Sequence, residues 1–354
     1  MPGNFSEALI IQQFTDFINS SQFRPKSNLT INADGNIHRY TLANEKSGGK
    51  SGAYCLHIDG YRPAGWAMDW HNTASKITWK YEYTDEERRE YGREMNNSES
   101  QAKYEAERKE HERRKAEKER SSNERKQQAL RMALAEFQHA HLTYSHLHPY
   151  LKSRFVDLGI FIPNTDLYIK CVVDAYKGGI CKQGELLVPM FNVITGKFQS
   201  LIHVPVTPDK ERGFMKYIYK DTSIIGAAHW FVPEHSSEAD TVLACEGITT
   251  ALACVVLTGG KTPVFSTGTC NNLFSVCEAL TKRYPNKRIC VMADDDKTTE
   301  HKTGHNPGIE AAEKCVSAGV AHYFKAPPGN HSVNYDWYDF LKEVIQNKKE
   351  GNNL

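Results

Sequence analysis

Two short apolar runs that each end in carboxylates constrain the fold of this chain more than any other feature. The runs cover residues 241–245 and 288–293; Glu246 follows the first and three aspartates, 294–296, follow the second. A short apolar run that stops at a turn is typical of a buried strand in a parallel sheet. Ligands of open α/β sheets bind beyond the carboxyl ends of such strands. Because carboxylates gathered there would repel one another, the pattern predicts a bound divalent cation.

Gly247 makes the first strand end suited to phosphate. Glycine permits a tight strand-to-helix turn and lets a phosphate approach the free N–H groups of a helix N-terminus. Asp294 and Asp296 add two carboxylates that point the same way from an extended segment, an arrangement that commonly holds one or two Mg²⁺ ions. The combination of Glu246-Gly247 with this Asp-x-Asp is more specific than either motif alone.

The C-terminal segment, residues 239–354, reads as alternating strands and helices. The expected strands cover residues 241–245, 262–266, 288–293 and 320–325, and the expected helices about 247–257, 271–283, 307–318 and 336–347. Alternation of this kind implies right-handed βαβ units and a central, mostly parallel sheet. We therefore expect an α/β fold for this domain.

A mixed α+β lead-in domain is expected immediately before it, in residues 141–238. The pattern around residues 192–197 predicts a β-hairpin. Basic side chains outnumber acidic ones between residues 152 and 220. A polyanion held beside a metal site would need such cations.

Residues 84–140 are expected to form a charged helical linker. Thr84 and Glu87 have the spacing of a capping box, and the residues that follow are mostly Glu, Lys, Arg, Gln and Ala. A helix with few apolar positions is solvated and stabilised by i,i+4 pairs, which makes it a semi-rigid spacer. We expect residues 96–98 to interrupt it.

Residues 1–83 are expected to form a small β-rich domain behind a first helix. Its basic and aromatic residues suit a surface for single-stranded nucleic acid; they are His38, Arg39, Lys50, Lys80, Tyr40, Trp66, Trp70 and Trp79. The alternative is that most of these aromatics form the core of the small domain. His38, Cys55, His57 and His71 are possible zinc ligands, but their spacing matches no standard finger or ribbon, so we expect no zinc.

Composition bounds the compartment and partners only coarsely. The chain has 44 Lys and Arg against 43 Asp and Glu, so any nucleic-acid surface must be local. The nine cysteines contain no CxxC pair, which favours buried free thiols. No signal-peptide pattern or membrane-spanning apolar run is present in the sequence. We expect no membrane partner and a reduced, cytoplasmic protein, in a bacterial cell or an infected bacterial host.

Several motifs together carry a resemblance to a known family. They are the Glu-Gly after an apolar strand at 242–247, the Asp-x-Asp at 294–296, HPYL at 148–151, a Pro-to-Gly hairpin at 189–196, Asn-Pro-Gly at 306–308 and Asp-x-x-Asp at 336–339. Residues 146–345 resemble the Toprim domain and N-terminal lead-in of primases, closest to those of conjugative plasmids and satellite phages and more distantly similar to bacterial DnaG. The regions of His38-Arg39 and Asp59-Gly60 resemble the N-terminal part of these phage proteins.

The resemblance implies a DNA primase, a DNA-directed RNA polymerase that makes short RNA primers on single-stranded DNA during plasmid, phage or other mobile-element replication. Asp294 and Asp296 would hold Mg²⁺ or Mn²⁺ against the triphosphate of a ribonucleoside triphosphate. Glu246 would hold or orient a second ion or act as general base. Asp339 would complete the acidic cluster.

The same resemblance, together with charge, suggests residues that bind nucleotide or nucleic acid. They are Gly247, Lys216, Lys152, Arg154, Asn306, His38 and Arg39. Two departures from the family matter. No Cys/His zinc module of the DnaG type is present in the sequence, and no GxxxxGK[ST] helicase motif occurs, so we expect a separate replicative helicase as partner.

Three other functions are consistent with part of the pattern. A Toprim nuclease uses the same carboxylates to cleave DNA, and a replication-associated binding protein would retain the fold without the chemistry. The run Asp294-x-Asp296-x-Thr298 also matches the DxDxT of haloacid-dehalogenase-type phosphatases, in which the first aspartate is phosphorylated. That family needs a lysine and further aspartates well downstream, and it leaves Glu246 unexplained.

Overall fold

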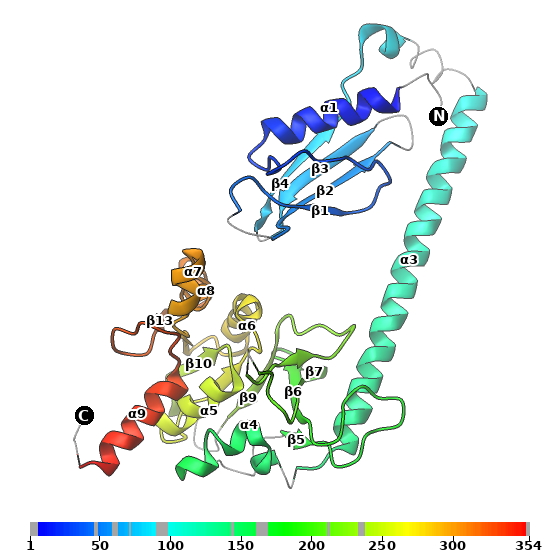
Figure 1. The fold of residues 1–354 in the computed structure, drawn as a ribbon. Helices are drawn as coiled ribbons and strands as arrows, with labels where there is room; N and C mark the ends of the chain where they lie inside the picture. The colour runs from blue at the N-terminus through cyan, green and yellow to red at the C-terminus, as the bar shows by residue number, and fades with distance from the viewer. Residues whose placement is uncertain are drawn as a thin grey trace. The chain divides into compact units, whose positions relative to one another are not determined.

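The computed structural model describes residues 6–45, 49–58, 63–70, 72–89, 98–142, 145–160, 169–210, 213–232 and 238–351. The chain divides into two compact units, Met1–Arg120 and Ser121–Leu354, which are treated separately below (Figure 1). The expectations for His71, for Asp59-Gly60 and for a helix break at residues 96–97 lie outside the described residues. In the described part of the chain, no helix is both long and apolar enough to cross a membrane.

The first unit packs one helix on an antiparallel sheet. Its elements are α1 (Glu7–Ser20), β1 (His38–Tyr40), β2 (Gly52–His57), β3 (Ala64–Asp69) and β4 (Asn72–Lys80), with the sheet in the order β1-β2-β3-β4. The buried side of α1 carries Ile10, Phe14 and Ile18, and the Phe14 ring meets Trp79 edge-on at 5.3 Å. Gly65 lies under that ring, where a Cβ would come within 2.5 Å of it. The glycine therefore lets helix and sheet approach closely.

A long solvated helix follows. Thr84 and Glu87 form the expected capping box, with Glu87 N donating to Thr84 Oγ1 at 3.2 Å. Helix α3 then runs from Ser98 to His139, with ion pairs one turn apart such as Arg114–Glu110 at 2.8 Å. Its Leu, Met and Phe residues are confined to its last turns, and there the helix is buried against other elements, as at Phe137.

A mixed sheet, nine-stranded as far as it is described, forms the second unit. Its strands are β5 (Lys170–Cys171), β6 (Leu186–Asn192), β7 (Phe198–Val204), β8 (Tyr217–Ile218), β9 (Ala227–Phe231), β10 (Thr241–Cys245), β11 (Val264–Ser266), β12 (Arg288–Met292) and β13 (Tyr323–Lys325). Their order is β13-β12-β10-β11-β9-β6-β7-β8, with β5 beside β6. Only β13, β12, β10 and β11 pair in parallel; the other neighbours pair antiparallel.

Helices cover both faces of the parallel part. They are α5 (Ile248–Leu257), α6 (Cys270–Arg283), α7 (Lys297–Thr303), α8 (Pro307–Ser317) and α9 (Trp337–Lys349), preceded by η1 (Ser145–Leu147), α4 (Pro149–Lys152) and η2 (Val156–Leu158). Alternate residues of β10 point to opposite faces. Leu243 and Cys245 join the core under α5 and α9, whereas Val242 and Ala244 join the core under α6 and α8. The sheet is therefore buried on both sides, which explains its uninterrupted apolar runs.

The expected strands and helices of residues 239–354 and the expected hairpin are all present, with ends shifted by a few residues. One element was not expected. Helix α7 lies in the segment after Asp296 that reads as a polar loop, because its sequence KTTEHKT has no apolar face and none of its residues is buried. The sheet also continues without a break from the lead-in strands into the parallel part.

Candidate active site

The carboxylates singled out in the sequence come together at one edge of the sheet. Strands β10 and β12 are parallel neighbours, with Cys245 opposite Met292, so the residues after them leave the sheet on the same side. Glu246 follows β10, and Asp294 and Asp296 follow β12. The charges of these three side chains act on one another, as their pKa values show. The structure thus forms the acidic centre that the sequence predicts.

These carboxylates are half-buried and poorly compensated. Burial raises the pKa of Asp294 well above its ordinary value, and Asp336, Glu246 and Asp296 raise it further, opposed by Lys216. Burial likewise raises the pKa of Glu246, with Lys216 opposing and Asp296 adding. Helix α6 begins beside Glu246, whose carboxylate accepts a bond from the Cys270 N–H. Proton uptake or a bound cation would relieve this repulsion.

Asp336, not Asp339, is the fourth carboxylate of the acidic centre. Asp336 caps α9 by accepting from Asp339 N at 2.9 Å, and its charge acts on Asp294. Asp339 completes the capping box and forms an ion pair with Lys342 at 2.7 Å. The sequence offered both aspartates of this Asp-x-x-Asp, and only the turn into α9 decides which one faces the centre. Asp336 therefore takes the place in the acidic centre that the sequence suggested for Asp339.

Lys216 is exposed as a whole residue, but its ammonium lies among the carboxylates and is crowded by protein atoms. Burial of the ammonium would by itself lower its pKa, but Tyr150, Glu246, Asp294 and Asp336 raise it, so the net shift is upward and the lysine stays charged. Its Nζ lies 3.7 Å from where a Cβ on Gly247 would be. Lys216 therefore places a positive charge in this centre; its contact with template or triphosphate, suggested by the sequence, stays a prediction.

The backbone at Gly247 does not require glycine, so the tight turn that glycine permits does not depend on it here. Gly247 is the N-cap of α5 with φ −90° and ψ 152°, which any residue adopts. Glycine instead leaves room at this position, because a side chain here would point toward Lys216 and Thr250. Thr250 Oγ1 in turn donates to Asp294 Oδ1 at 3.2 Å.

The Asn-Pro-Gly segment holds the aspartate loop in place. Asn306 is buried; its Oδ1 accepts from Asp296 N at 3.1 Å, and its Nδ2 donates to Asp295 Oδ1 at 2.8 Å. Gly308 N donates to Asp296 Oδ2 at 3.1 Å. With its amide engaged within the protein, Asn306 acts as a positioning residue. Asp295 points to this amide and to Lys297, 3.9 Å away, and not into the acidic centre.

The two basic residues of the lead-in differ in their surroundings. The Arg154 guanidinium stacks on the rings of Tyr150 and Phe214, at 4.4 and 5.6 Å from their centroids. The Tyr150 hydroxyl lies 3.4 Å from Thr249 Oγ1 on α5, which places this stack beside the acidic centre. Lys152 is exposed and paired with Asp157.

The aromatics of the first unit are divided between its two sheet faces. Tyr40 and Trp79 are buried in the core under α1, as the alternative interpretation expected. Trp66 neighbours the core residue Ala67 along β3 and therefore points to the opposite face. There the Lys76 ammonium lies 4.6 Å from the Trp66 ring.

Arg39 extends this basic and aromatic face. It neighbours Tyr40 on β1, and its guanidinium lies 4.5 Å from the ring of the exposed Trp70. Its side chain also donates to the carbonyl of Lys50. His38 instead bonds Asp34 at 2.8 Å and stacks on Tyr54. The candidate nucleic-acid face is thus carried by Arg39, Lys76 and the two outward tryptophans.

Substituting Asp294 by Asn should stabilise the metal-free protein. A carboxyl whose pKa is raised on folding costs stability as pH rises from the ordinary value through the raised one, so at pH 7 the wild type bears this repulsion. We expect Asp294→Asn to raise Tm in EDTA by about 2–4 °C per kcal/mol of repulsion removed. Mg²⁺ should raise the Tm of the wild type only. Asp157→Asn, an exposed acid outside the centre, is the control; a lower Tm for Asp294→Asn in EDTA would contradict this account.

Gly308 and Gly247 form a matched pair of glycine-to-alanine tests. A Cβ on Gly308 would lie 2.3 Å from the carbonyl oxygen of Asp294, whereas the nearest atom to one on Gly247 is 3.4 Å away. Gly308→Ala should therefore cost about 1–3 kcal/mol despite better helix propensity, and Gly247→Ala about 0.5 kcal/mol or less. Denaturant unfolding measures both. Equal losses would show that Gly308 does not fix the Asp294 backbone.

Comparisons with known proteins agree with the sequence motifs. No protein-family model matches the chain. It is similar to DNA primase TraC of Escherichia coli, with 25% identity over 291 residues that cover 80% of this chain and 17% of that protein.

Two solved structures are remotely similar. The primase fragment of the bacteriophage T7 primase-helicase has 16% identity and a TM-score of 0.32, and the match covers 47% of this chain and 61% of that one. The DnaG primase catalytic domain bound to ssDNA has 10% identity and a TM-score of 0.41, and the match covers 64% of this chain and 80% of that one. The resemblance to primases is thus confirmed by sequence similarity to a curated primase, of which this chain spans less than a fifth.

Proposed function

We propose that this chain is a DNA primase that synthesises short RNA primers on single-stranded DNA by metal-dependent nucleotidyl transfer. One observation carries the proposal: Glu246, Asp294, Asp296 and Asp336 meet at the carboxyl ends of parallel strands, facing Lys216. The similarity to DNA primase TraC supports it. Replication of a plasmid, phage or other mobile element is the context that the family resemblance favours.

The proposed architecture follows the same motifs. We assign residues 239–354 to a Toprim catalytic domain and residues 141–238 to its basic lead-in. Residues 84–140 are the charged helical linker, and residues 1–83 a domain for template binding. The parallel strands β13, β12, β10 and β11 with helices on both faces support the first assignment.

The acidic centre fits Mg²⁺ or Mn²⁺. Its donors are carboxylate oxygens, which hard cations prefer. Within the described residues, no three of these carboxylates bring ligand atoms within 4.8 Å of one another. Such an open set suits Mg²⁺, which is usually bound by one or two carboxylates together with water and substrate phosphates. When bound, the ion neutralises charge on the triphosphate and on the leaving pyrophosphate.

The protein's own groups supply the rest of the chemistry. The Lys216 ammonium binds and orients the anionic triphosphate beside the open N-terminus of α5 at Gly247. Glu246 accepts the proton of the attacking 3′-hydroxyl at its carboxylate, since its raised pKa makes it a better base than an exposed glutamate. Arg154, preorganised on two rings, contacts the phosphate backbone of template or primer.

The alternatives are less consistent with the site. A phosphatase of the DxDxT type would need Thr298 in its centre, whereas Thr298 bonds Asn334 through its backbone N–H and its hydroxyl. A nuclease would use the same carboxylates to cleave DNA. A binding protein would not need charged carboxylates recessed in a site. An assay that measures both primer synthesis and cleavage of the template strand separates these functions.

A priming assay tests the proposal directly. The full chain is incubated with single-stranded DNA, Mg²⁺ or Mn²⁺ and labelled ribonucleotides, and short RNA products are expected. Asp294→Ala should abolish them. Asp336→Asn, which keeps an N-cap acceptor, should reduce them by about 10²-fold. The matched Asp339→Asn should change them less than about threefold, because its carboxylate faces Lys342. No product from wild type, or equal product from Asp294→Ala, would refute a primase; template cleavage in its place would identify a nuclease.

Binding of single-stranded DNA tests the face of the first unit. Trp70→Ala and Trp66→Ala should each weaken binding by about 1–3 kcal/mol, because each removes a stacking platform. Arg39→Ala should weaken binding and reduce its salt dependence. Lys26→Ala, which removes one positive charge outside the two cation–ring pairs, is the control. Fluorescence anisotropy over a salt series measures all four, and unchanged affinity in both tryptophan variants would exclude this face.

A further inference from the structure

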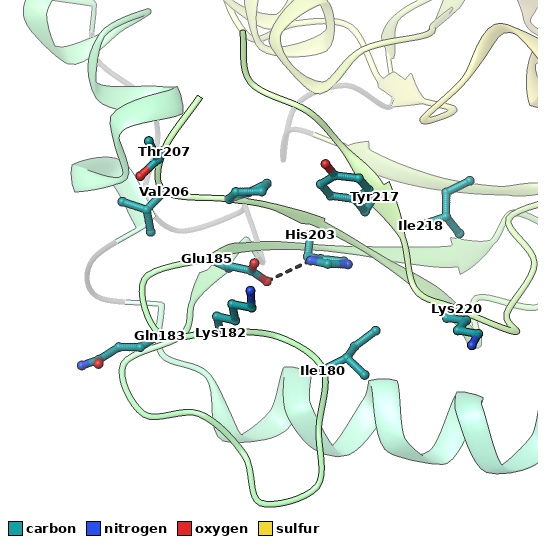
Figure 2. A pocket seen from close by; sticks show the side chains of 11 residues that line it. Ile180, Lys182, Gln183, Glu185, His203, Val206, Thr207, Tyr217, Ile218 and Lys220 are labelled. Atoms are coloured by element: carbon teal, nitrogen blue, oxygen red, sulfur yellow. Dashed lines mark hydrogen bonds and ion pairs between the residues drawn. The ribbon is translucent and has the colours of Figure 1, made fainter. Parts of the chain in front are cut away.

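A second group of metal-ligand side chains lies beside the β6–β7 hairpin. Cys181, Glu185 and His203 each offer one ligand atom, and the three atoms lie within 4.8 Å of one another. In the part of the chain that the structure describes, no other three ligand atoms of His, Cys, Asp or Glu gather so closely. Figure 2 shows Glu185 and His203 facing each other in the wall of a pocket of about 630 Å³.

The sheet fixes two of these side chains. His203 lies on β7 opposite Leu187 of β6. Glu185 directly precedes β6; its N–H donates to Lys182 O at 3.1 Å, and its carbonyl accepts from Val172 N at 2.9 Å. His203 Nδ1 and Glu185 Oε2 are 2.9 Å apart. Backbone hydrogen bonds in and beside the sheet therefore fix the positions of both residues.

A buried carboxylate on α3, that of Glu136, fixes the loop of the third ligand, Cys181. Glu136 accepts from Ile180 N at 2.9 Å, from Cys181 N at 2.8 Å and from the hydroxyl of Tyr219. Gly179 makes this contact possible, since a Cβ there would lie 2.3 Å from the Glu136 carboxyl carbon. The loop that carries Cys181 is thus clamped against the end of α3.

The charge around this group favours a cation. Cys181 and Glu185 are 3% and 6% exposed, and Glu136, at 3%, adds a second buried carboxylate. Lys182 and Lys220 line the same pocket (Figure 2), and His203 is the hydrogen-bond partner of Glu185. A bound cation would take over from His203 as the partner of this buried carboxylate.

We propose that Cys181, Glu185 and His203 form a binding site for one zinc-class divalent cation. A thiolate with an imidazole and a carboxylate suits Zn²⁺ and not Mg²⁺. Zinc–ligand bonds of about 2.0–2.3 Å place the ligand atoms of a tetrahedral site about 3.3–3.8 Å apart. Binding therefore requires the Cys181 sulfur to move toward the other two ligand atoms by about 1 Å or less. The Glu185 oxygen and the His203 nitrogen move slightly apart. Three protein ligands leave the fourth position for water or a ligand from the pocket. The ion ties the clamped loop to the hairpin.

The site is independent of the candidate zinc ligands weighed from the sequence. Those are His38, Cys55, His57 and His71 of residues 1–83, whose spacing predicts no zinc. The present ligands belong to the second unit and match no spacing rule either, because the hairpin and the loop before it, not the sequence order, bring them together.

Cobalt binding tests the proposal. Co²⁺ replaces Zn²⁺ and reports a thiolate ligand through a charge-transfer band. The full chain is titrated with CoCl₂ in millimolar excess of Mg²⁺, which fills oxygen-only sites. We expect one equivalent of Co²⁺ per chain, the thiolate band, and displacement by Zn²⁺. Cys181→Ser should lose the band and bind more than about tenfold more weakly. His203→Gln should also weaken binding, and Zn²⁺ should raise the Tm of wild type more than that of either variant.

Two variants serve as controls. Cys171→Ser removes a thiol of the same region, one that donates to Gly184 O at 3.3 Å, and should keep band and affinity. Asp294→Asn should keep them as well. No stoichiometric binding, or a band that survives Cys181→Ser, overturns the site. Loss of the band in Asp294→Asn would place the ion in the acidic centre instead, which also overturns it. None of these readouts depends on priming activity.

Discussion

Repulsion among the recessed carboxylates at the ends of β10 and β12 is the constraint on which this structure depends. Four acidic groups share one edge of the sheet with the ammonium of Lys216. Such an arrangement persists only if the surrounding backbone is over-determined. Asn306 and Gly308 supply this by holding the Asp296 segment through its N–H and its carboxylate. The metal-free protein therefore gives up stability for a site that a cation completes.

The sheet behind that edge provides the rigidity. Alternate residues of β10 and β12 enter two separate cores, one under α5 and α9 and the other under α6 and α8. A rotation of either strand would disturb both cores at once, because protein interiors are close-packed. The strand ends, and the carboxylates that follow them, are fixed by packing on both faces.

Local sequence predicted most of this arrangement, because a buried parallel strand followed by a carboxylate is a local pattern. Glu246, Asp294 and Asp296 come together as the motifs predict. What depends on three-dimensional contacts could not be predicted. The turn into α9 selects Asp336 over Asp339, the amide of Asn306 is used internally, and α7 has no apolar face to reveal it. Strand alternation also divides the aromatics of the first unit: Tyr40 and Trp79 belong to its core, whereas Trp66 points to the opposite face, where the nucleic-acid surface stays a prediction.

The two proposed ion sites need not compete, because their ligands differ in chemistry. The carboxylates of the acidic centre offer oxygen atoms, spread widely enough to require water or phosphate to complete the coordination of a hard cation. The Cys181 site combines sulfur, nitrogen and oxygen in a compact set, which favours a softer ion by a margin that excess Mg²⁺ does not overcome. The first ion arrives with substrate and serves chemistry. The second, held between a clamped loop and a hairpin, serves structure, so chelation should loosen the lead-in before it affects the parallel sheet.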